Sequence, residues 1–168
     1  RDDHKKIKGN FGGAVGMKVG KANKDECDIY IKLRKEYMAD TNKREKINLT
    51  KTDSEIKKEF LTPVNNKNNN IYSIEYNGEV IGYINFNLFK NNGKKTLYIN
   101  DIFISKNFRG KGHGKLSMEW IIDFSKNKKC NRIGLGAGAK NKRAQKMYEK
   151  IGFKIVGVNY GMDLKWKN

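Results

Sequence analysis

The sequence has little of what builds disulfide-bonded, metal-binding or membrane proteins. Among its 168 residues are two cysteines, Cys27 and Cys130, at no metal-binding spacing, and two histidines, His4 and His113. We therefore expect free thiols in a reducing compartment, a cytoplasmic location and no metal site. No apolar run approaches the ~18 residues that span a membrane. The polar start, residues 1–8, also lacks the apolar segment of a secretory signal, so we expect no membrane association.

Acidic residues are scarce relative to basic ones: 18 Asp and Glu stand against 36 Lys and Arg, a formal net charge of +18. Such a surface attracts polyanions, nucleic acid included. The lysines are spread along the whole chain, however, and asparagine accompanies them, as in the run 65–70, which indicates a compositional bias of the coding sequence. We therefore do not expect nucleic acid as a partner. A basic nucleic-acid-binding module stays an alternative, and it would need its basic residues on one face with exposed aromatic residues.

The chain is long enough to bury a core, and 37% of its residues are hydrophobic and 11% aromatic. We expect a single domain over residues 17–168. Residues 1–16 are glycine-rich and lack periodicity, so we interpret them as a leader or an expression remnant before a natural start at Met17.

Periodicity and turn signals predict alternating helices and strands. A strand at 17–21 precedes a helix at 25–38 and a second helix that opens with a capping-box pattern at Thr52 and ends at the only proline, Pro63. Strands at 71–76, 80–89 and 97–104, joined by Asn77-Gly78 and by a turn at 91–93, predict an antiparallel meander. We then expect a helix up to Lys126, a strand at 132–137, a helix at 141–151, and strands at 153–158 and 162–166.

A glycine-rich turn between the strand at 97–104 and the following helix is the most informative stretch. Glycines without a Cβ let a ligand approach the backbone closely, and the helix start adds unpaired N–H groups. Cationic side chains add whole charges. The turn comprises Arg109, Gly110, Lys111, Gly112, His113, Gly114 and Lys115. This pattern predicts a site for a phosphate-rich anion, with a plain surface turn as the alternative.

The pattern Arg-x-x-Gly-x-Gly, formed by Arg109, Gly112 and Gly114, resembles the coenzyme A pyrophosphate loop of the GNAT superfamily of N-acetyltransferases. A second block is similar to the family's Asn-x-x-Ala-x-x-x-Tyr-x-x-x-Gly-Phe; it consists of Asn141, Ala144, Tyr148, Gly152 and Phe153. The predicted order of elements from 17 to 166 is also similar to that family. The resemblance implies an α/β fold: a twisted, mostly antiparallel mixed sheet of six to seven strands, split at the coenzyme A site and flanked by about four helices.

The resemblance also implies where acetyl-coenzyme A binds. The pantetheine arm would lie along backbone groups of Ile102, Phe103 and Ile104, in a gap between the strands at 97–104 and 132–137. The phosphates would sit on the N–H groups between Arg109 and Lys115, with the side chain of His113 facing the cofactor or solvent. In the second block, Ala144 would line the cofactor, and Asn141 would hydrogen-bond the cofactor or cap its helix.

By the same resemblance, Tyr148 would protonate the departing thiolate, since a phenol of pKa ~10 can hydrogen-bond a thiolate whose acid has a pKa of ~8.5. An N–H of the 102–104 segment would stabilise the oxyanion. Some relatives, diamine acetyltransferases among them, carry a Glu-Asp pair where this chain has Asn100 and Asp101. Only Asp101 could then act as base or hold a cationic amine, and strand alternation predicts that the two side chains lie on opposite faces.

The predicted function is transfer of an acetyl group from acetyl-CoA to a primary amine by direct attack in a ternary complex. The acceptor would be a small molecule or a peptide amine, and the positive surface disfavours highly cationic acceptors unless Asp101 and Glu36 form an acidic pocket. A coenzyme A sensor without catalysis is an alternative, and a homodimer is compatible with the sequence.

Overall fold

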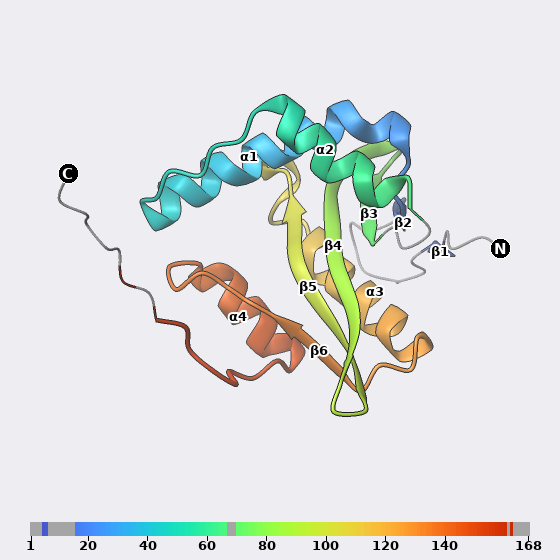
Figure 1. Cartoon of the computed structure of the whole chain (residues 1–168), viewed down its shortest axis with the longest axis vertical. Coiled ribbons are helices and arrows are strands. Elements are labelled where there is room, and N and C mark those ends of the chain that lie inside the picture. The colour runs from blue at the N-terminus through green and yellow to red at the C-terminus, as the bar shows by residue number, and fades with distance from the viewer. Residues whose placement is uncertain (1–4, 7–15, 67–69, 161, 163–168) are drawn as a thin grey trace.

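Six strands form one sheet in the computed structural model of the chain, which describes residues 5–6, 16–66, 70–160 and 162. The strands lie in chain order (Figure 1): β1 (Lys5–Lys6), β2 (Met17–Lys21), β3 (Ile71–Tyr76), β4 (Glu79–Asn91), β5 (Lys94–Ile104) and β6 (Arg132–Leu135). Neighbouring strands are antiparallel, except that β5 and β6 run parallel. The predicted mixed, mostly antiparallel sheet is confirmed, and β1 is an edge strand that the sequence did not indicate.

Helices cover the two faces of this sheet. α1 (Cys27–Glu45) follows the short 3-10 turn η1 (Lys24–Glu26), and α2 (Asp53–Val64) packs beside it. Both cover one face at one end of the long strands, while α3 (His113–Asn127) lies on the other face (Figure 1). α4 (Lys142–Ile151) follows β6. Among the described residues, no helix is both long and apolar enough to cross a bilayer.

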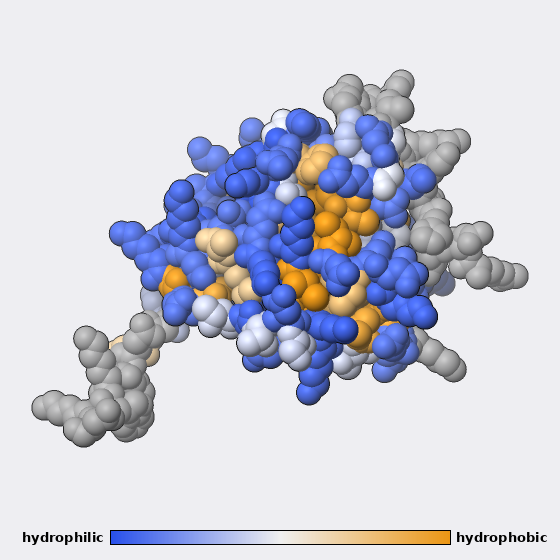
Figure 2. Space-filling model, turned by 90° about the horizontal axis from the view of Figure 1, so that it is seen from above, coloured by the Kyte–Doolittle hydropathy of each residue, from blue (hydrophilic) through white to orange (hydrophobic). Residues whose placement is uncertain are grey.

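The two cores follow from the alternation of β4. After the register shift at residues 80–82, even-numbered residues such as Ile84 and Phe86 pack with α3, and odd-numbered Tyr83 packs with α1 and α2. Seen from above, the surface is mostly hydrophilic and is interrupted by a band of apolar residues (Figure 2). The hairpin turn predicted at Asn77-Gly78 has positive φ at both residues, as a two-residue turn requires.

Helix ends agree with local capping signals. Thr52 accepts a hydrogen bond from the Glu55 N–H, while the Glu55 carboxylate accepts one from the Thr52 N–H, the predicted capping box. α2 continues one residue past Pro63. α1 runs seven residues beyond the predicted end at 38, because Met38 and Thr41 are buried and extend its packed face.

The strand predicted at 153–158 is wrong: this segment has no regular structure. Its β-branched residues favour a strand, but Ile155 is 81% exposed and Val156 78%, so no neighbouring strand packs against them. Strand propensity acts only through such contacts. β6 also ends at Leu135, two residues before its predicted end. The strand predicted at 162–166 lies outside the described residues, apart from Met162.

Candidate active site

The edge of β5 that faces β6 is paired along one half and open along the other. Parallel pairing joins residues 96–99 of β5 to residues 132–135 of β6 and stops there, whereas β5 continues to Ile104. The gap expected between these two strands is therefore present. Beyond residue 99, the β6 side of β5 has no strand partner, and a ligand that can pair with a strand could take that position.

The register decides which backbone groups point into this gap. In an antiparallel ladder, residues bonded to the neighbouring strand alternate with residues whose N–H and C=O point away. Ser105 donates its N–H to Ile81 of β4 at 2.9 Å, so by the register of β4 and β5 the groups of Phe103 point to β4 and those of Ile102 and Ile104 point away from it. Of the three predicted pantetheine contacts, Ile102 and Ile104 have the required direction and Phe103 does not.

A β-bulge lies at Asn100. Asn85 pairs with Asp101 and Phe86 with Ile99, so β5 carries one extra residue at this point. The amide of Asn100 contacts those of Asn85 and Asn87 at 3.3 and 3.4 Å, on the face that also carries Asp101. The prediction that Asn100 and Asp101 lie on opposite faces is therefore wrong, because the bulge interrupts the alternation.

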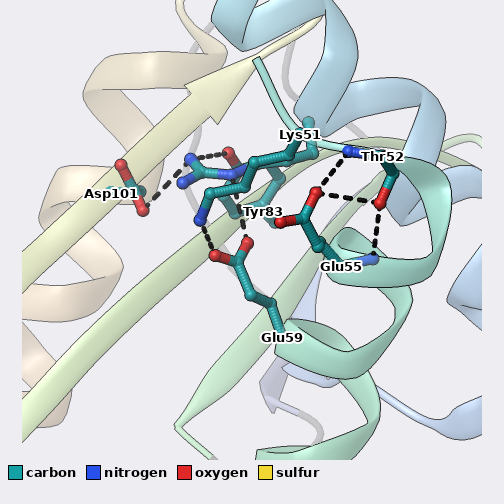
Figure 3. A network of polar contacts seen from close by, with 7 residues as sticks. Lys51, Thr52, Glu55, Glu59, Tyr83 and Asp101 are labelled. Atoms are coloured by element: carbon teal, nitrogen blue, oxygen red, sulfur yellow. Dashed lines mark hydrogen bonds and ion pairs between the residues drawn. The ribbon is translucent and has the colours of Figure 1, made fainter. Parts of the chain in front are cut away.

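Asp101 lies in a network with α1 and α2 (Figure 3). Its carboxylate is 3.4 Å from the guanidinium of Arg34, which also donates to the hydroxyl of Tyr83 at 3.3 Å and lies 3.8 Å from Glu59. Glu59 is in turn paired with Lys51. Burial alone would lower the pKa of Arg34, but Tyr83 and Asp101 raise it above its ordinary range. The network holds two cations and two anions, so Asp101 adds no net negative charge.

Tyr37 of α1 interacts electrostatically with this network and with Tyr148 of α4, and the sequence analysis did not identify it as a site residue. Burial, followed by the charge of Asp101, raises the pKa of Tyr37. Tyr37 also adds to the raised pKa of Tyr148, whose main cause is burial. The two candidate catalytic residues, Asp101 and Tyr148, therefore approach the same phenol. Nothing in the local sequence distinguishes Tyr37 from a core tyrosine.

The glycine turn has the backbone that its sequence indicates. Gly110 and Gly112 have φ of +80° and +86°, and Gly112 is the N-cap of α3. A Cβ on Gly112 would meet nothing within 4 Å, so the space in front of it is open to a ligand. The first turn of α3 contains no acidic residue. Its positive dipole end is therefore uncompensated by its own helix.

Arg109 is directed away from this open space. It donates from Nε to the carbonyl of Ile104 at 2.7 Å, its Nη2 lies 2.6 Å from Asp40, and its guanidinium stacks over Phe103 at 5.0 Å. Glu36 also approaches it at 3.8 Å and accepts from the N–H of Lys106. Arg109 therefore links the end of β5, through the Ile104 carbonyl, to Asp40 of α1.

The cationic side chain beside the glycine turn is Arg143 of α4, not Arg109 as the sequence suggested. A Cβ on Gly110 would lie 4.0 Å from its guanidinium, and a Cβ on Gly114 would lie 3.6 Å from Met147. The guanidinium of Arg143 therefore reaches the turn, and Met147, in the middle of α4, lies beside the start of α3. The first turn of α4 also lacks an acidic residue. The N-terminus of α3 and the guanidinium of Arg143 together form a concentration of positive charge, which a bound anion would compensate.

The second predicted block forms the start of α4 as expected. The side chain of Asn141 accepts a hydrogen bond from the N–H of Ala144 at 3.3 Å, so its capping role is confirmed. Ala144 is half-buried on the first turn. Tyr148 packs against the core and lies 6.0 Å from the ring of Phe153.

His113 does not face solvent or an open site, contrary to expectation. It is 1% exposed, its ring lies 4.6 Å from that of Tyr76, and neither ring nitrogen has a hydrogen-bond partner among the described residues. Burial, followed by the charge of Lys111, lowers its pKa. His113 is the first residue of α3. Its side chain points into the core, and its backbone N–H is one of the N–H groups at the start of the helix.

Sites for metal ions are absent from the described residues, where no three His, Cys, Asp or Glu side chains gather. The remaining predicted cations at the turn have protein contacts: Lys111 lies 5.8 Å from the ring of Phe108, and Lys115 lies 3.6 Å from Glu119.

Comparison with known proteins places the fold and the glycine turn in one family. The model of the "Acetyltransferase (GNAT) family" matches residues 30–153, well over half of the chain, and this range contains the open edge of β5, the glycine turn and α4. The chain belongs to the GNAT acetyltransferase family.

Curated GNAT relatives are distant. The chain is 30% identical over 87 residues to a probable spermine N(1)-acetyltransferase of Bacillus subtilis subsp. natto, which covers 49% of this chain and 57% of the relative. It is 24% identical over 137 residues to an uncharacterised N-acetyltransferase of Archaeoglobus fulgidus. This match covers 79% of this chain and 89% of the relative. The chain thus spans little more than half the length of the Bacillus relative.

Solved structures show the same fold at low identity. A possible acetyltransferase from Clostridium difficile 630 superposes with a TM-score of 0.70 at 15% identity, covering 89% of this chain and 99% of that one. The ribosomal-protein-alanine N-acetyltransferase of Brucella melitensis biovar Abortus 2308 superposes with a TM-score of 0.69 at 14% identity. The superposition covers 89% of this chain and 100% of that one. These likenesses concern the GNAT fold alone.

Proposed function

We propose that this chain transfers the acetyl group of acetyl-CoA to a primary amine by direct attack in a ternary complex. Three features support the proposal: the open edge of β5, the glycine turn that follows it, and Tyr148, which comes directly after Met147 beside that turn. The family membership supports the same reaction. As predictions, we keep a single domain over 17–168 and a cytoplasmic location; a homodimer is compatible with the sequence.

The residues present fit acetyl-CoA. The C=O of Ile102 and the N–H of Ile104 point away from β4, where an amide-containing pantetheine arm can pair with them, and the N–H of Ile102 is left for the oxyanion. The phosphates fit the start of α3, with the open space at Gly112 and the guanidinium of Arg143 beside it. We assign direct phosphate contact to Arg143 and a positioning role to Arg109.

The chemistry divides among three groups. Acetyl-CoA supplies a thioester carbon; the amine nitrogen attacks it, and the carbon–sulfur bond breaks. The Ile102 N–H can stabilise the oxyanion, a contribution on the order of 3 kcal/mol to the barrier. Tyr148, whose raised pKa keeps it protonated, gives a proton to the thiolate. The amine releases a proton toward Asp101, and Arg34 holds that carboxylate in position.

The first test is a thermal shift with acetyl-CoA on the parent, Gly112→Val and Gly93→Val. Gly93 has φ of +75° and open space at its Cβ position, as Gly112 does, but lies in the β4–β5 turn; it is therefore a matched control for backbone strain. At ~100-fold excess over Kd, binding adds about 2.7 kcal/mol and raises Tm by several degrees. We expect this rise in the parent and Gly93→Val and its loss in Gly112→Val.

A second measurement separates the enzyme from the alternatives. Thiol release from acetyl-CoA in the presence of a panel of primary amines should occur in the parent only with an acceptor present. Acetyl-CoA binding without thiol release for any amine would favour a coenzyme A sensor. Salt-sensitive binding to nucleic acid, with no thermal shift by acetyl-CoA, would favour the basic module; the comparisons lend no support to either.

A further inference from the structure

A row of amides occupies the part of the sheet that α1 and α2 leave uncovered. These helices cross only one end of β4 and β5 (Figure 1), so β4 changes from buried Tyr83 to half-buried Asn85 and exposed Asn87 along the same face. The bulge at Asn100 adds a third amide, which contacts both of the others at 3.3 and 3.4 Å. We call this row, with the exposed rings of Phe89 and Tyr98, the amide face.

Tyr98 has a fixed place beside this row. Its ring lies flat against β6, where a Cβ on Gly134 would come within 3.0 Å of it and a Cβ on Gly136 within 3.4 Å of its hydroxyl. The glycines that weaken β6 as a strand therefore make room for the ring. Tyr98 is still 39% exposed and Phe89 45%, so both offer an apolar surface next to hydrogen-bonding groups.

The electrostatics of the amide face exclude a strong attraction for polycations. Its five side chains are uncharged, although 32% of the residues of the chain are charged. At the end nearest the proposed reaction centre, the charge of Asp101 is balanced by Arg34, and that of Glu59 by Lys51. The chain as a whole carries +18. A multiply charged amine would meet no net negative charge here and would be repelled at longer range.

We propose that the amide face binds the acceptor, and that this acceptor is a single primary amine on a neutral, hydroxyl-bearing scaffold, an amino sugar. The inference rests on the proposed acetyl transfer. Each amide offers a donor and an acceptor to hydroxyl groups, and Tyr98 offers its ring to the C–H face of a sugar. A scaffold lying on the row would present its amine to Asp101, which follows Asn100 directly.

The test measures binding separately from turnover. Glucosamine and spermidine are titrated against the full chain in the presence of coenzyme A and followed by saturation-transfer NMR, with Asn87→Ala and Asn100→Ala as variants. We expect glucosamine to bind and spermidine not to bind. Loss of one hydrogen-bonding amide should weaken glucosamine binding about threefold to tenfold. Lys90→Ala, exposed on the same strand, is the control and should bind as the parent does.

Asn100→Glu gives the converse test, because a second carboxylate beside Asp101 makes this end of the face negative and should admit spermidine. Spermidine binding to the parent, or glucosamine binding that neither Asn variant weakens, overturns the inference. Absence of glucosamine binding does the same. Glucosamine binding through these amides with no thiol release would instead refute the acetyl transfer and leave the amide face as a sugar-binding surface.

Discussion

Removing the hydroxyl of Tyr148 isolates its chemistry from its packing. The Tyr148→Phe ring can keep the 6.0 Å contact with Phe153, and no hydrogen bond of the hydroxyl is recorded among the described residues, so the free energy of unfolding should change by less than ~1 kcal/mol. For a chain of this size that is a change in Tm of only about 2–4 °C. The proton for the thiolate, however, is lost. Positioned general acids contribute about 10²- to 10⁴-fold, so kcat should fall by that factor.

The pH dependence provides a second, independent readout for Tyr148. A general acid works only while protonated, and burial raises the pKa of Tyr148 above its ordinary 10.0. The parent should therefore keep its kcat up to at least pH 10 and lose it above, whereas Tyr148→Phe should lack this alkaline loss. Tyr160→Phe, at a residue that is 94% exposed, is the control. A kcat for Tyr148→Phe within threefold of the parent, measured by thiol release, would refute the assignment.

Three further predictions concern the neighbouring elements. Arg143→Ala should weaken acetyl-CoA binding about tenfold or more in calorimetry, as loss of a charge-assisted hydrogen bond does; Arg109→Ala should lower Tm more and affinity less, and the opposite order would contradict the two roles. Asn141→Ala should cost about 1 kcal/mol in urea unfolding through the lost cap, and no loss would remove that role. Because burial lowers the pKa of His113, the unfolded chain takes up a proton that the folded chain resists, so the free energy of unfolding should decrease as pH falls below about 6.5. His113→Phe should show a smaller decrease, and an equal one would mean that His113 is not the group responsible.

Patterns read within a few residues predicted much of the site. The capping box at Thr52, the hairpin at Asn77-Gly78 and the cap at Asn141 all depend on groups two to four residues apart, and each is present. The positive φ of Gly112 belongs to the same class of local constraint. Such features could be recognised without knowing the packing, because their partners are fixed by the chain itself.

Side-chain directions at the site could not be read this way. Arg109 looked like a phosphate ligand until Asp40, sixty-nine residues earlier, was found beside it. His113 looked exposed because it lies in a polar, glycine-rich turn, yet Tyr76 covers it. Tyr37 and Arg143 carried no signal of their own, since their positions depend on how α1 and α4 approach the end of β5 and the glycine turn.

The order of strands and helices, the glycine turn and the family were determined by the sequence itself, because periodicity, turn residues and spaced motifs act over short distances. Only the tertiary structure decided which face each strand residue occupies beyond the bulge at Asn100. One extra residue in β5 places Asn100 and Asp101 on the same face, because the neighbouring strand β4, and not β5 alone, sets the register. The segment 153–158 shows the converse: its residues favour a strand, but a strand also needs a partner.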